Sequence, residues 1–202
     1  PIMKEKITEK ATEMFLNLGF KSVTMDDLAN EMGVSKKTIY THFENKIKLV
    51  HECTQYLFKC ITDGIEKIVV LDKNPIEEQF EIKKFLAQYL KDEKSFPQFQ
   101  LQKYYPKIYK NLHRQEYETM LHCVTSNLQR GIEQGIYRKN LDVSFTARIY
   151  FSGMVSIKNR ELFPQELFPA STLGNVYLEY HIRGIATEKG KQILNDIINS
   201  NQ

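Results

Sequence analysis

Apolar residues recur along this chain every three or four positions, and this spacing places side chains on one face of an α-helix. The first such face lies within residues 4–18 and comprises Ile7, Ala11, Met14, Phe15 and Leu18. Gly19 follows as a helix terminator. No alternating apolar and polar stretch of useful length occurs, and the 202 residues include only 9 Gly and 6 Pro. The sequence therefore predicts an all-α fold.

Capping residues, glycines and prolines predict the later helix boundaries. We expect helices within residues 46–70, 76–90, 106–135, 143–157, 173–186 and 188–200, with a break at Phe96–Pro97. Pro106 suits the first turn of its helix. Asp142 and Thr187 suit N-cap positions, and either Ser171 or Thr172 caps the helix before the last.

The composition limits the class of protein. No apolar run approaches the roughly 18 residues that a membrane span needs, so no membrane role is expected. Cys53, Cys60 and Cys123 form no CxxC pair, which disfavours disulfides and favours the reducing cytoplasm. The net charge is only +3, so any argument for nucleic-acid binding has to be local.

Two short helices with clear caps follow the first helix. Thr24 and Asp27 are spaced as a capping box, with Asp in place of the usual Glu. Gly33 is expected to end this helix in the left-handed conformation and turn the chain sharply. Ser35 is the N-cap of the next helix, which ends near Phe43.

This second short helix carries hydrogen-bond donors on its outer side. With Ile39 and Phe43 turned toward a core, the outward face and its two shoulders hold Lys37, Thr38, Tyr40 and Thr41. No acidic residue precedes Glu44 in this helix, and residues 35–50 contain four Lys and one Glu. The face is therefore locally basic, unlike the chain as a whole.

Two short helices joined by a tight turn predict a helix-turn-helix, whose second helix enters the major groove while the first crosses the DNA backbone. The hydroxyl of Thr24 and the free N–H groups of that helix start can meet a phosphate. Lys46, at the start of the following helix, can meet another. The alternative interpretation is three ordinary surface helices with a solvated face.

Residues 11–50, which read ATEMFLNLGFKSVTMDDLANEMGVSKKTIYTHFENKIKLV, resemble the DNA-binding domain of TetR-family transcriptional regulators. The matching features are Phe15, Gly19, Phe20, Thr24, Ile39–Tyr40 before His42–Phe43, and Lys46 followed by Leu49. The resemblance implies an N-terminal three-helix DNA-binding head in residues 1–46 and a helical effector-binding and dimerisation domain in residues 47–202. It also implies a repressor, the commoner mode of the family, that binds a palindromic operator in double-stranded DNA.

The resemblance implies roles for individual residues of the head. Phosphate contacts fall on Thr24, Tyr40, His42 and Lys46, and groove-facing positions on Lys36, Lys37, Thr38 and Thr41, next to the cap residue Ser35. Tyr40 stands where it can also touch a base. For Lys37 two roles stay open: its ammonium reaches a guanine edge, or it adds a further phosphate contact.

Two late apolar stripes suggest a homodimer. They comprise Ala147, Tyr150, Phe151 and Met154 on one predicted helix, and Leu173, Val176, Tyr177 and Tyr180 on the next. Paired with their symmetry mates, two such stripes would form a four-helix bundle. The alternative is that both stripes face the chain's own core. The family resemblance, which implies dimerisation through the last long helices, favours the dimer.

The middle of the chain is rich in aromatic residues. Those we expect to bind a small apolar or aromatic effector are Tyr89, Phe99, Tyr105, Tyr109 and Tyr117. Ordinary core packing is the alternative interpretation. An effector that prefers a conformation with wrongly spaced DNA-binding heads would release the operator.

Other classes of function are less well supported. No HExxH, GxSxG, GxGxxG or GxxxxGK[ST] motif occurs, and the five His show no metal-ligand spacing, so neither an enzyme nor a metal or other cofactor is expected. A redox-sensing regulator with no small-molecule effector would use Cys53, Cys60 or Cys123, although only Lys59 stands near them to lower a thiol pKa. An architectural DNA binder without an effector is a third possibility.

Overall fold

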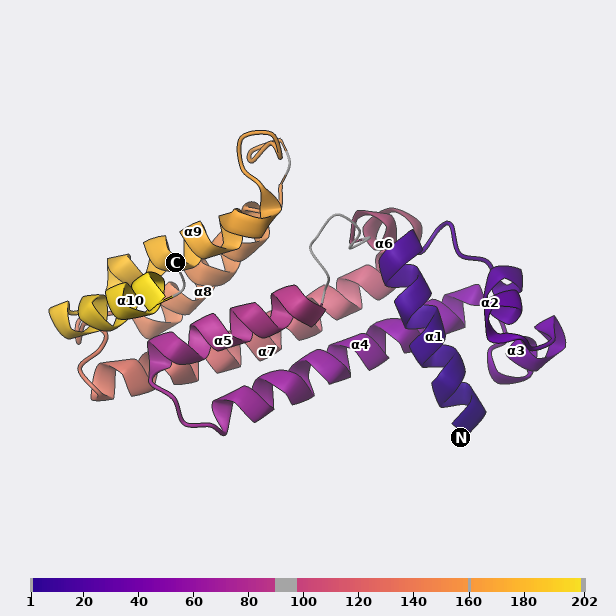
Figure 1. Cartoon of the computed structure of the whole chain (residues 1–202), viewed down its shortest axis with the longest axis horizontal. Coiled ribbons are helices and arrows are strands. Elements are labelled where there is room, and N and C mark those ends of the chain that lie inside the picture. The colour runs from indigo at the N-terminus through magenta and orange to yellow at the C-terminus, as the bar shows by residue number, and fades with distance from the viewer. Residues whose placement is uncertain (1, 90–97, 160, 201–202) are drawn as a thin grey trace. The chain divides into compact units, whose positions relative to one another are not determined.

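The structure is a computed structural model, and it describes residues 2–89, 98–159 and 161–200. The helices run in the order α1 (Ile2–Leu18), α2 (Met25–Met32), α3 (Lys36–His42), α4 (Lys46–Val69), α5 (Pro75–Tyr89), α6 (Gln98–Tyr104), α7 (Pro106–Glu133), α8 (Val143–Ser156), α9 (Ala170–Ile185) and α10 (Glu188–Ser200) (Figure 1). Within these ranges the only strand-like pairing is an isolated bridge between Tyr137 and Ala186. The predicted all-α fold is confirmed. The expected break at Phe96–Pro97 lies outside the described residues.

The chain forms two compact units. The first holds Pro1–Gly64 and Gln88–Glu116, and the second holds Ile65–Ala87 and Tyr117–Gln202. Each unit has its own hydrophobic core. The predicted functional boundary after residue 46 concerns DNA binding rather than compactness, and it stays a prediction. In the described part of the chain, no helix combines the length and apolar character that crossing a membrane requires.

The core of the first unit contains the predicted inner face of α1, with one exception. Ile7, Ala11, Met14 and Phe15 are buried. The predicted inward position of Leu18 is wrong, because this side chain is 60% exposed. The chain turns at Gly19, whose φ is +90°, and the ring of Phe20 then packs 5.0 Å from that of Phe15. Phe20, rather than Leu18, therefore covers this end of the core.

Local caps begin two of the later helices as predicted. The carboxylate of Asp142 accepts a hydrogen bond from the N–H of Phe145 at 3.0 Å and so opens α8. The hydroxyl of Thr187 accepts from the N–H of Gly190 at 3.2 Å and opens α10. Pro106 is the first residue of α7, where its missing N–H costs nothing.

Helix α9 begins earlier than predicted. It starts at Ala170, and Pro169 is its N-cap residue with no side-chain hydrogen bond. The hydroxyl of Thr172 donates to the carbonyl of Pro169 at 3.1 Å, so it caps no N–H group. Pro169 has a φ of −58°, which already suits entry into a helix. The prediction that Thr172 caps the helix is wrong, and the side chain of Ser171 lies outside the described residues.

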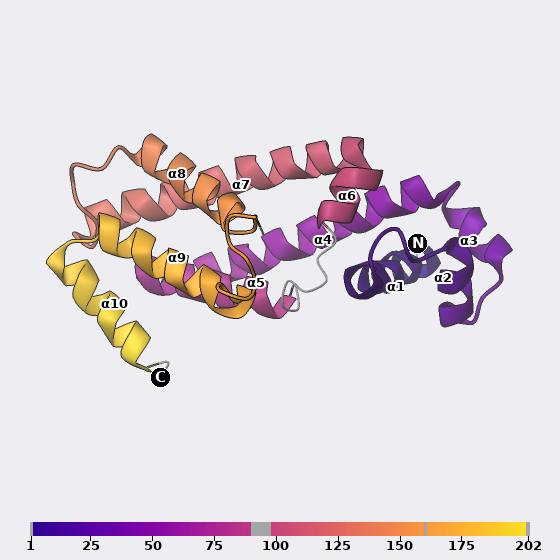
Figure 2. The ribbon, with the colours of Figure 1, turned by 90° about the horizontal axis from the view of Figure 1, so that it is seen from above.

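Helices α8 and α9 lie side by side in both views of the second unit (Figures 1 and 2). The hydroxyl of Tyr177 donates to the carbonyls of Ile149 and Tyr150 across this contact. It approaches so closely to Gly153 that a Cβ at this position would overlap the Tyr177 hydroxyl. The two helices are thus held together within one chain by backbone-directed hydrogen bonds.

This packing turns most of the predicted dimer stripes inward. Ala147 and Leu173 are buried, and Tyr150, Phe151, Met154 and Tyr177 are at least partly buried. Ala147 and Leu173 therefore face the chain's own core, as the alternative interpretation has it, while the place of the partly buried residues in a dimer stays a prediction. Val176 and Tyr180 do point outward, and Tyr180 is 75% exposed. The apolar residues exposed on this helix pair are Phe145, Ile149, Val155, Val176 and Tyr180.

Candidate DNA-binding site

Helix α2 begins with a reciprocal pair of hydrogen bonds. The hydroxyl of Thr24 accepts from the N–H of Asp27 at 3.1 Å, and the Asp27 carboxylate accepts from the N–H of Thr24 at 2.8 Å. The Thr24 hydroxyl also donates to this carboxylate at 2.8 Å, and the bonds from Thr24 lower the pKa of Asp27. The predicted capping box is confirmed. A phosphate at this helix start would therefore meet the free N–H groups of Met25 and Asp26 rather than the hydroxyl proton.

The turn between α2 and α3 depends on a glycine. Gly33 has a φ of +65°, in the left-handed region that residues with a Cβ avoid. Its N–H and that of Val34 bond back to carbonyls at the end of α2, and the chain then enters α3. Ser35 opens α3 by accepting from the N–H of Thr38 at 3.0 Å. Both views show α2 and α3 next to each other at one end of the first unit (Figures 1 and 2).

Helix α3 is anchored by two buried residues, as the sequence predicts. Ile39 is 0% and Phe43 is 2% exposed. Lys37 and Thr41 are exposed on the opposite side, and Tyr40 is exposed beside them. A helix held in this way presents a fixed set of side chains to a partner.

Several polar groups of α3 already have partners within the chain. The Nζ of Lys36 lies 2.8 Å from a carboxylate oxygen of Asp26, and this bond raises the pKa of Lys36. The hydroxyls of Ser35 and Thr38 lie 2.8 Å apart. Among the described residues no ion pair includes Lys37. Of the two lysines predicted to face the groove, Lys37 is therefore the one whose ammonium is in no ion pair of the described residues.

Thr41 and His42 are also predicted to contact DNA, and the structure places them differently. The hydroxyl of Thr41 donates to the carbonyl of Lys37 at 2.9 Å, which leaves its oxygen as an acceptor. His42 is half-buried at the end of α3. The structure thus brings the predicted α3 residues onto one small surface, and their contacts with DNA stay predictions.

Lys46 lies differently from the α3 residues. It is half-buried, and its Nζ donates to the carbonyl of Lys21 at 3.1 Å and lies 5.9 Å from the ring centroid of Phe15. Burial lowers the pKa of Lys46, while the nearby carboxylate of Asp27 opposes this shift. Its ammonium is therefore directed into the head, and its contact with a phosphate stays a prediction.

Sequence reasoning missed the side chains of α6 that hold the turn between α1 and α2. Oε1 of Gln100 accepts from the N–H of Lys21 at 2.9 Å. The Nζ of Lys21 lies 5.0 Å from the ring centroid of Tyr104, within reach of a cation–π contact. Lys21 and Gln100 are 79 positions apart, so no local sequence pattern could have paired them.

The predicted effector residues fall in both compact units. Tyr105 and Tyr109 are partly buried against the core of the first unit, where burial raises the pKa of both hydroxyls. Phe99 is exposed on α6. Tyr117 belongs to the second unit, where it accepts a hydrogen bond from Arg148 and packs against Phe151. The side chain of Tyr89 lies outside the described residues, and a pocket shared by these residues stays a prediction.

The cysteines and the clusters of ionisable side chains give little support to a redox or metal site. Burial raises the pKa of Cys53 to about 12, and it also raises the pKa of Cys123. Both groups are therefore thiols rather than reactive thiolates near neutral pH. Cys60 is half-buried on α4. In the ranges that the structure describes, no group of three His, Cys, Asp or Glu side chains could hold a metal ion.

Comparisons with known proteins bear on the same segment. Residues 7–53 match the sequence model of "Bacterial regulatory proteins, tetR family". IcaR of Staphylococcus aureus (strain Newman), the negative transcriptional regulator of the biofilm operon icaADBC, is 29% identical over 72 residues. That alignment covers 36% of this chain and 37% of IcaR, little more than a third of the relative's length. KstR2 of Mycolicibacterium smegmatis, a transcriptional repressor, is 22% identical over 192 residues, which cover 93% of this chain and 92% of KstR2.

Solved structures share the whole fold at low identity. A TetR-family regulator from Cytophaga hutchinsonii gives a TM-score of 0.71 at 18% identity, over 93% of this chain and 96% of that one. SmeT, the repressor of the Stenotrophomonas maltophilia multidrug efflux pump SmeDEF, gives 0.69 at 14% identity, over 92% and 91%. At such identities the likeness shows the fold alone.

The capped helix pair α2–α3, its glycine turn and its basic outer face define a helix-turn-helix DNA-binding protein. The family match lies over the same residues. Residues 7–53 therefore carry a DNA-binding segment similar to that of the TetR family.

Proposed function

We propose that this chain is a ligand-responsive repressor, active in the cytoplasm, that binds a palindromic operator as a homodimer and releases it when a small molecule binds. The outer face of α3 carries this proposal. Because Ile39 and Phe43 are buried, Lys37 and Thr41 are held outward on a rigid element. Side chains presented in this way suit the base edges of the major groove.

Two observations support a dimer: α3 is too short to recognise a long DNA sequence alone, and α8 and α9 expose an apolar face. One α3 helix spans only a few base pairs, so specific binding needs two copies on neighbouring turns of DNA. Helices α8 and α9 expose Phe145, Ile149, Val176 and Tyr180. An apolar patch of this kind on a monomer commonly marks a protein interface. We place the second copy of the chain on this face.

The effector is proposed to be a small apolar or aromatic molecule. Its binding would favour a conformation in which the two heads no longer match the spacing of the operator half-sites. A cysteine-based sensor is less well supported, because burial raises the pKa of both Cys53 and Cys123. The small-molecule mechanism therefore remains the preferred one.

Selection from random double-stranded DNA tests the DNA-binding part of the proposal. The wild-type chain should enrich a palindrome whose half-sites lie about 10 base pairs apart, or a multiple of this spacing. Recovery of no common sequence would contradict a specific regulator and would favour an architectural DNA binder.

Light scattering at micromolar concentration tests the dimer. The wild type should be a dimer, whereas the double variant Val176→Asp, Tyr180→Asp should be a monomer with an unchanged circular-dichroism spectrum and much weaker operator binding. Ser144→Asp, an exposed α8 change outside the apolar patch, serves as the matched control. A monomeric wild type would rule the dimer out.

A further inference from the structure

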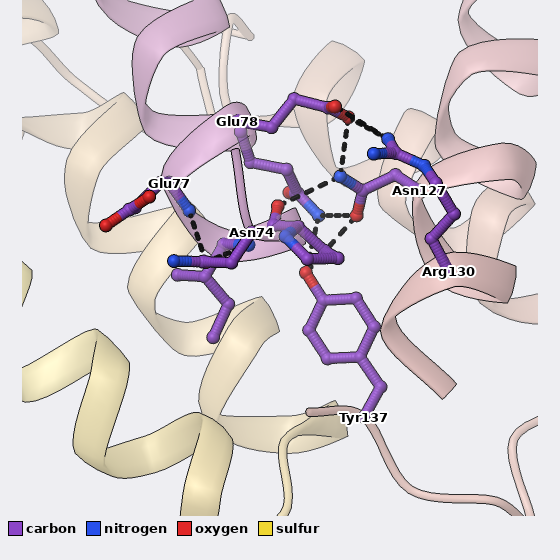
Figure 3. Close-up of polar contacts among 9 residues, drawn as sticks. Asn74, Glu77, Glu78, Asn127, Arg130 and Tyr137 are labelled. Carbon is purple, nitrogen blue, oxygen red and sulfur yellow. Dashed lines mark hydrogen bonds and ion pairs between the residues drawn. The ribbon is translucent and has the colours of Figure 1, made fainter. Parts of the chain in front are cut away.

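A network of buried and partly buried polar side chains joins α5 to α7 within the second unit (Figure 3). The Glu78 carboxylate accepts two hydrogen bonds of 2.6 Å from the guanidinium of Arg130. Nδ2 of Asn127 donates to Oε1 of Glu78 at 2.8 Å and to the carbonyl of Pro75 at 2.9 Å. Because a carboxylate and a carbonyl can only accept, these two bonds determine which end of the Asn127 amide is nitrogen.

The orientation of Asn127 then determines that of Gln79. Oδ1 of Asn127 accepts from Nε2 of Gln79 at 2.9 Å and from the hydroxyl of Tyr137 at 3.2 Å. Nε2 of Gln79 also lies 3.2 Å from the Tyr137 hydroxyl. Since Nε2 has to donate into this network, the carbonyl oxygen Oε1 of Gln79 is left outside it as an acceptor.

This acceptor is buried and unmatched. Gln79 is 8% exposed, and its Oε1 has no hydrogen-bond partner among the described residues. Native proteins contain few buried polar atoms of this kind, because an unmade hydrogen bond in the interior costs folding free energy. No other buried side-chain atom of the described network lacks a partner, so the unmatched atom is specific to this position. Its natural partner is a hydrogen-bond donor that the described residues do not supply.

Through Tyr137, Gln79 adjoins an aromatic and apolar core. Tyr137 belongs to the core of the second unit, and Tyr150 packs against the same core. The ring of His181 lies 4.5 Å from that of Tyr150, centroid to centroid, and its Nε2 is a second buried atom without a partner in the described ranges. A molecule that entered this core would meet ring faces and a few polar atoms, as most small-molecule sites provide.

Within the described network, the two charged side chains pair with each other. Glu78 and Arg130 neutralise each other through their paired hydrogen bonds. Burial lowers the pKa of His181 to about 4, so its imidazole is neutral at pH 7. A charged ligand would lose its hydration here without gaining a countercharge. The chemistry therefore favours a neutral ligand.

We propose that Oε1 of Gln79 is the polar anchor of an effector site in the second unit, and that the effector is a neutral, largely apolar molecule that donates a hydrogen bond from a hydroxyl or N–H group to it. This inference rests on the proposed function, because it specifies the effector of a ligand-responsive regulator. It moves the expected contacts from the predicted tyrosines to Gln79 on α5.

Three naphthalene probes of one ring size test the ligand class on the full chain at pH 7. The probe 2-naphthol is a neutral donor, 2-methoxynaphthalene only accepts, and 2-naphthoate is an anion. Dissociation constants are measured by isothermal titration calorimetry. The wild type should bind 2-naphthol about tenfold more tightly than either other probe, since a site built for a donor discriminates against analogues that lack it.

Two variants distinguish the effect of the Gln79 acceptor from that of the surrounding hydrogen-bond network. Gln79→Met keeps a side chain of similar length without the acceptor, and it should bind 2-naphthol and 2-methoxynaphthalene equally. Tyr137→Phe removes a hydroxyl from the same network but leaves Oε1 in place, so it should keep the preference for 2-naphthol. Circular dichroism checks that each variant is folded.

A measurement on the wild type covers the case in which Gln79→Met fails to fold. Addition of 2-naphthol should shift the side-chain amide resonances of Gln79 in a ¹⁵N spectrum, whereas 2-methoxynaphthalene should not. Absence of binding by all three probes, equal affinity for the first two, a preference for 2-naphthoate, or an unshifted Gln79 amide would each overturn the inference. Operator binding by the same samples without a probe is read separately, so loss of the DNA-binding proposal would be distinguished from loss of the site.

Discussion

The Nζ of Lys46 donates a hydrogen bond of 3.1 Å to the backbone carbonyl of Lys21, and so joins the start of α4 to the turn between α1 and α2. Helix α6 also contacts this turn, because the N–H of Lys21 donates a hydrogen bond to Oε1 of Gln100. The turn leads directly to Thr24, the cap of α2. The placement of α2 therefore depends on residues that lie far apart in the sequence.

Replacement of Lys46 by Met keeps the apolar stem and removes the donor. We expect the free energy of unfolding to fall by about 1 kcal/mol, the usual contribution of one partly exposed hydrogen bond. Urea denaturation measures this change. The slope of log affinity against log salt should stay unchanged, because the ammonium is directed into the head. A slope that becomes shallower by about 0.9 for each copy would instead show that Lys46 neutralises a phosphate.

Replacement of Lys37 by Ala should weaken operator binding by about tenfold or more, because its ammonium is the exposed charge on the outer face of α3. Fluorescence anisotropy across a salt series measures the effect. Lys67→Ala, which removes an exposed charge from the far end of α4, is the matched control and should change little.

The same Lys37 variant decides between the two roles that the sequence left open. A phosphate contact predicts an equal loss for all DNA sequences and a shallower salt slope. A guanine contact predicts relaxed preference at one position of the half-site. An unchanged affinity for every sequence would contradict both.

Replacement of Asp26 by Asn should strengthen DNA binding severalfold. The Asp26 carboxylate pairs with the ammonium of Lys36 at 2.8 Å and brings a negative charge close to the DNA-facing surface. Its removal frees Lys36 for a phosphate and steepens the salt dependence. Anisotropy with operator and with unrelated DNA measures this gain, and weaker binding of both would show that the ion pair is needed to position Lys36.

Replacement of Gly131 by Ala should destabilise the second unit by about 2–3 kcal/mol, as overpacking of a rigid core does. A Cβ at this position would overlap the ring of Tyr137, which is fully buried and hydrogen-bonded to Asn127. Gly184→Ala is the control, since no atom lies within 4 Å of its added Cβ and the change should be neutral or slightly stabilising. Thermal unfolding compares the two variants, and equal melting temperatures would contradict this packing.

The buried imidazole of His181 should make stability fall in mild acid. Burial lowers its pKa from 6.5 to about 4, so the unfolded chain binds a proton that the folded chain excludes within this range. Stability is complete above about pH 6.5 and is lost as the pH falls toward 4, by about 2 kcal/mol at pH 5. Denaturation at pH 7 and pH 5 measures the loss. His181→Phe should be less sensitive to pH, and equal sensitivity would contradict the buried neutral imidazole.

The helix-turn-helix was predictable from the sequence because each of its structural devices is local. Thr24 and Asp27 are three positions apart, Ser35 caps an N–H three positions on, and Gly33 needs only its own backbone freedom. Ile39 and Phe43, one turn apart, face inward by helical periodicity alone. Such interactions form within one or two turns, so the order of residues specifies them directly.

The tertiary structure decided which faces and atoms these helices leave available. Leu18 and Ala147 follow the same helical periodicity, yet one is exposed and the other buried, because only one is covered by a neighbouring helix. The hydrogen bond between Asn127 and Glu78 spans 49 positions, and it determines indirectly which end of the Gln79 side-chain amide lacks a partner. Periodicity specifies the direction of a side chain on its own helix, whereas its burial and its hydrogen-bond partner depend on which other helix packs against it.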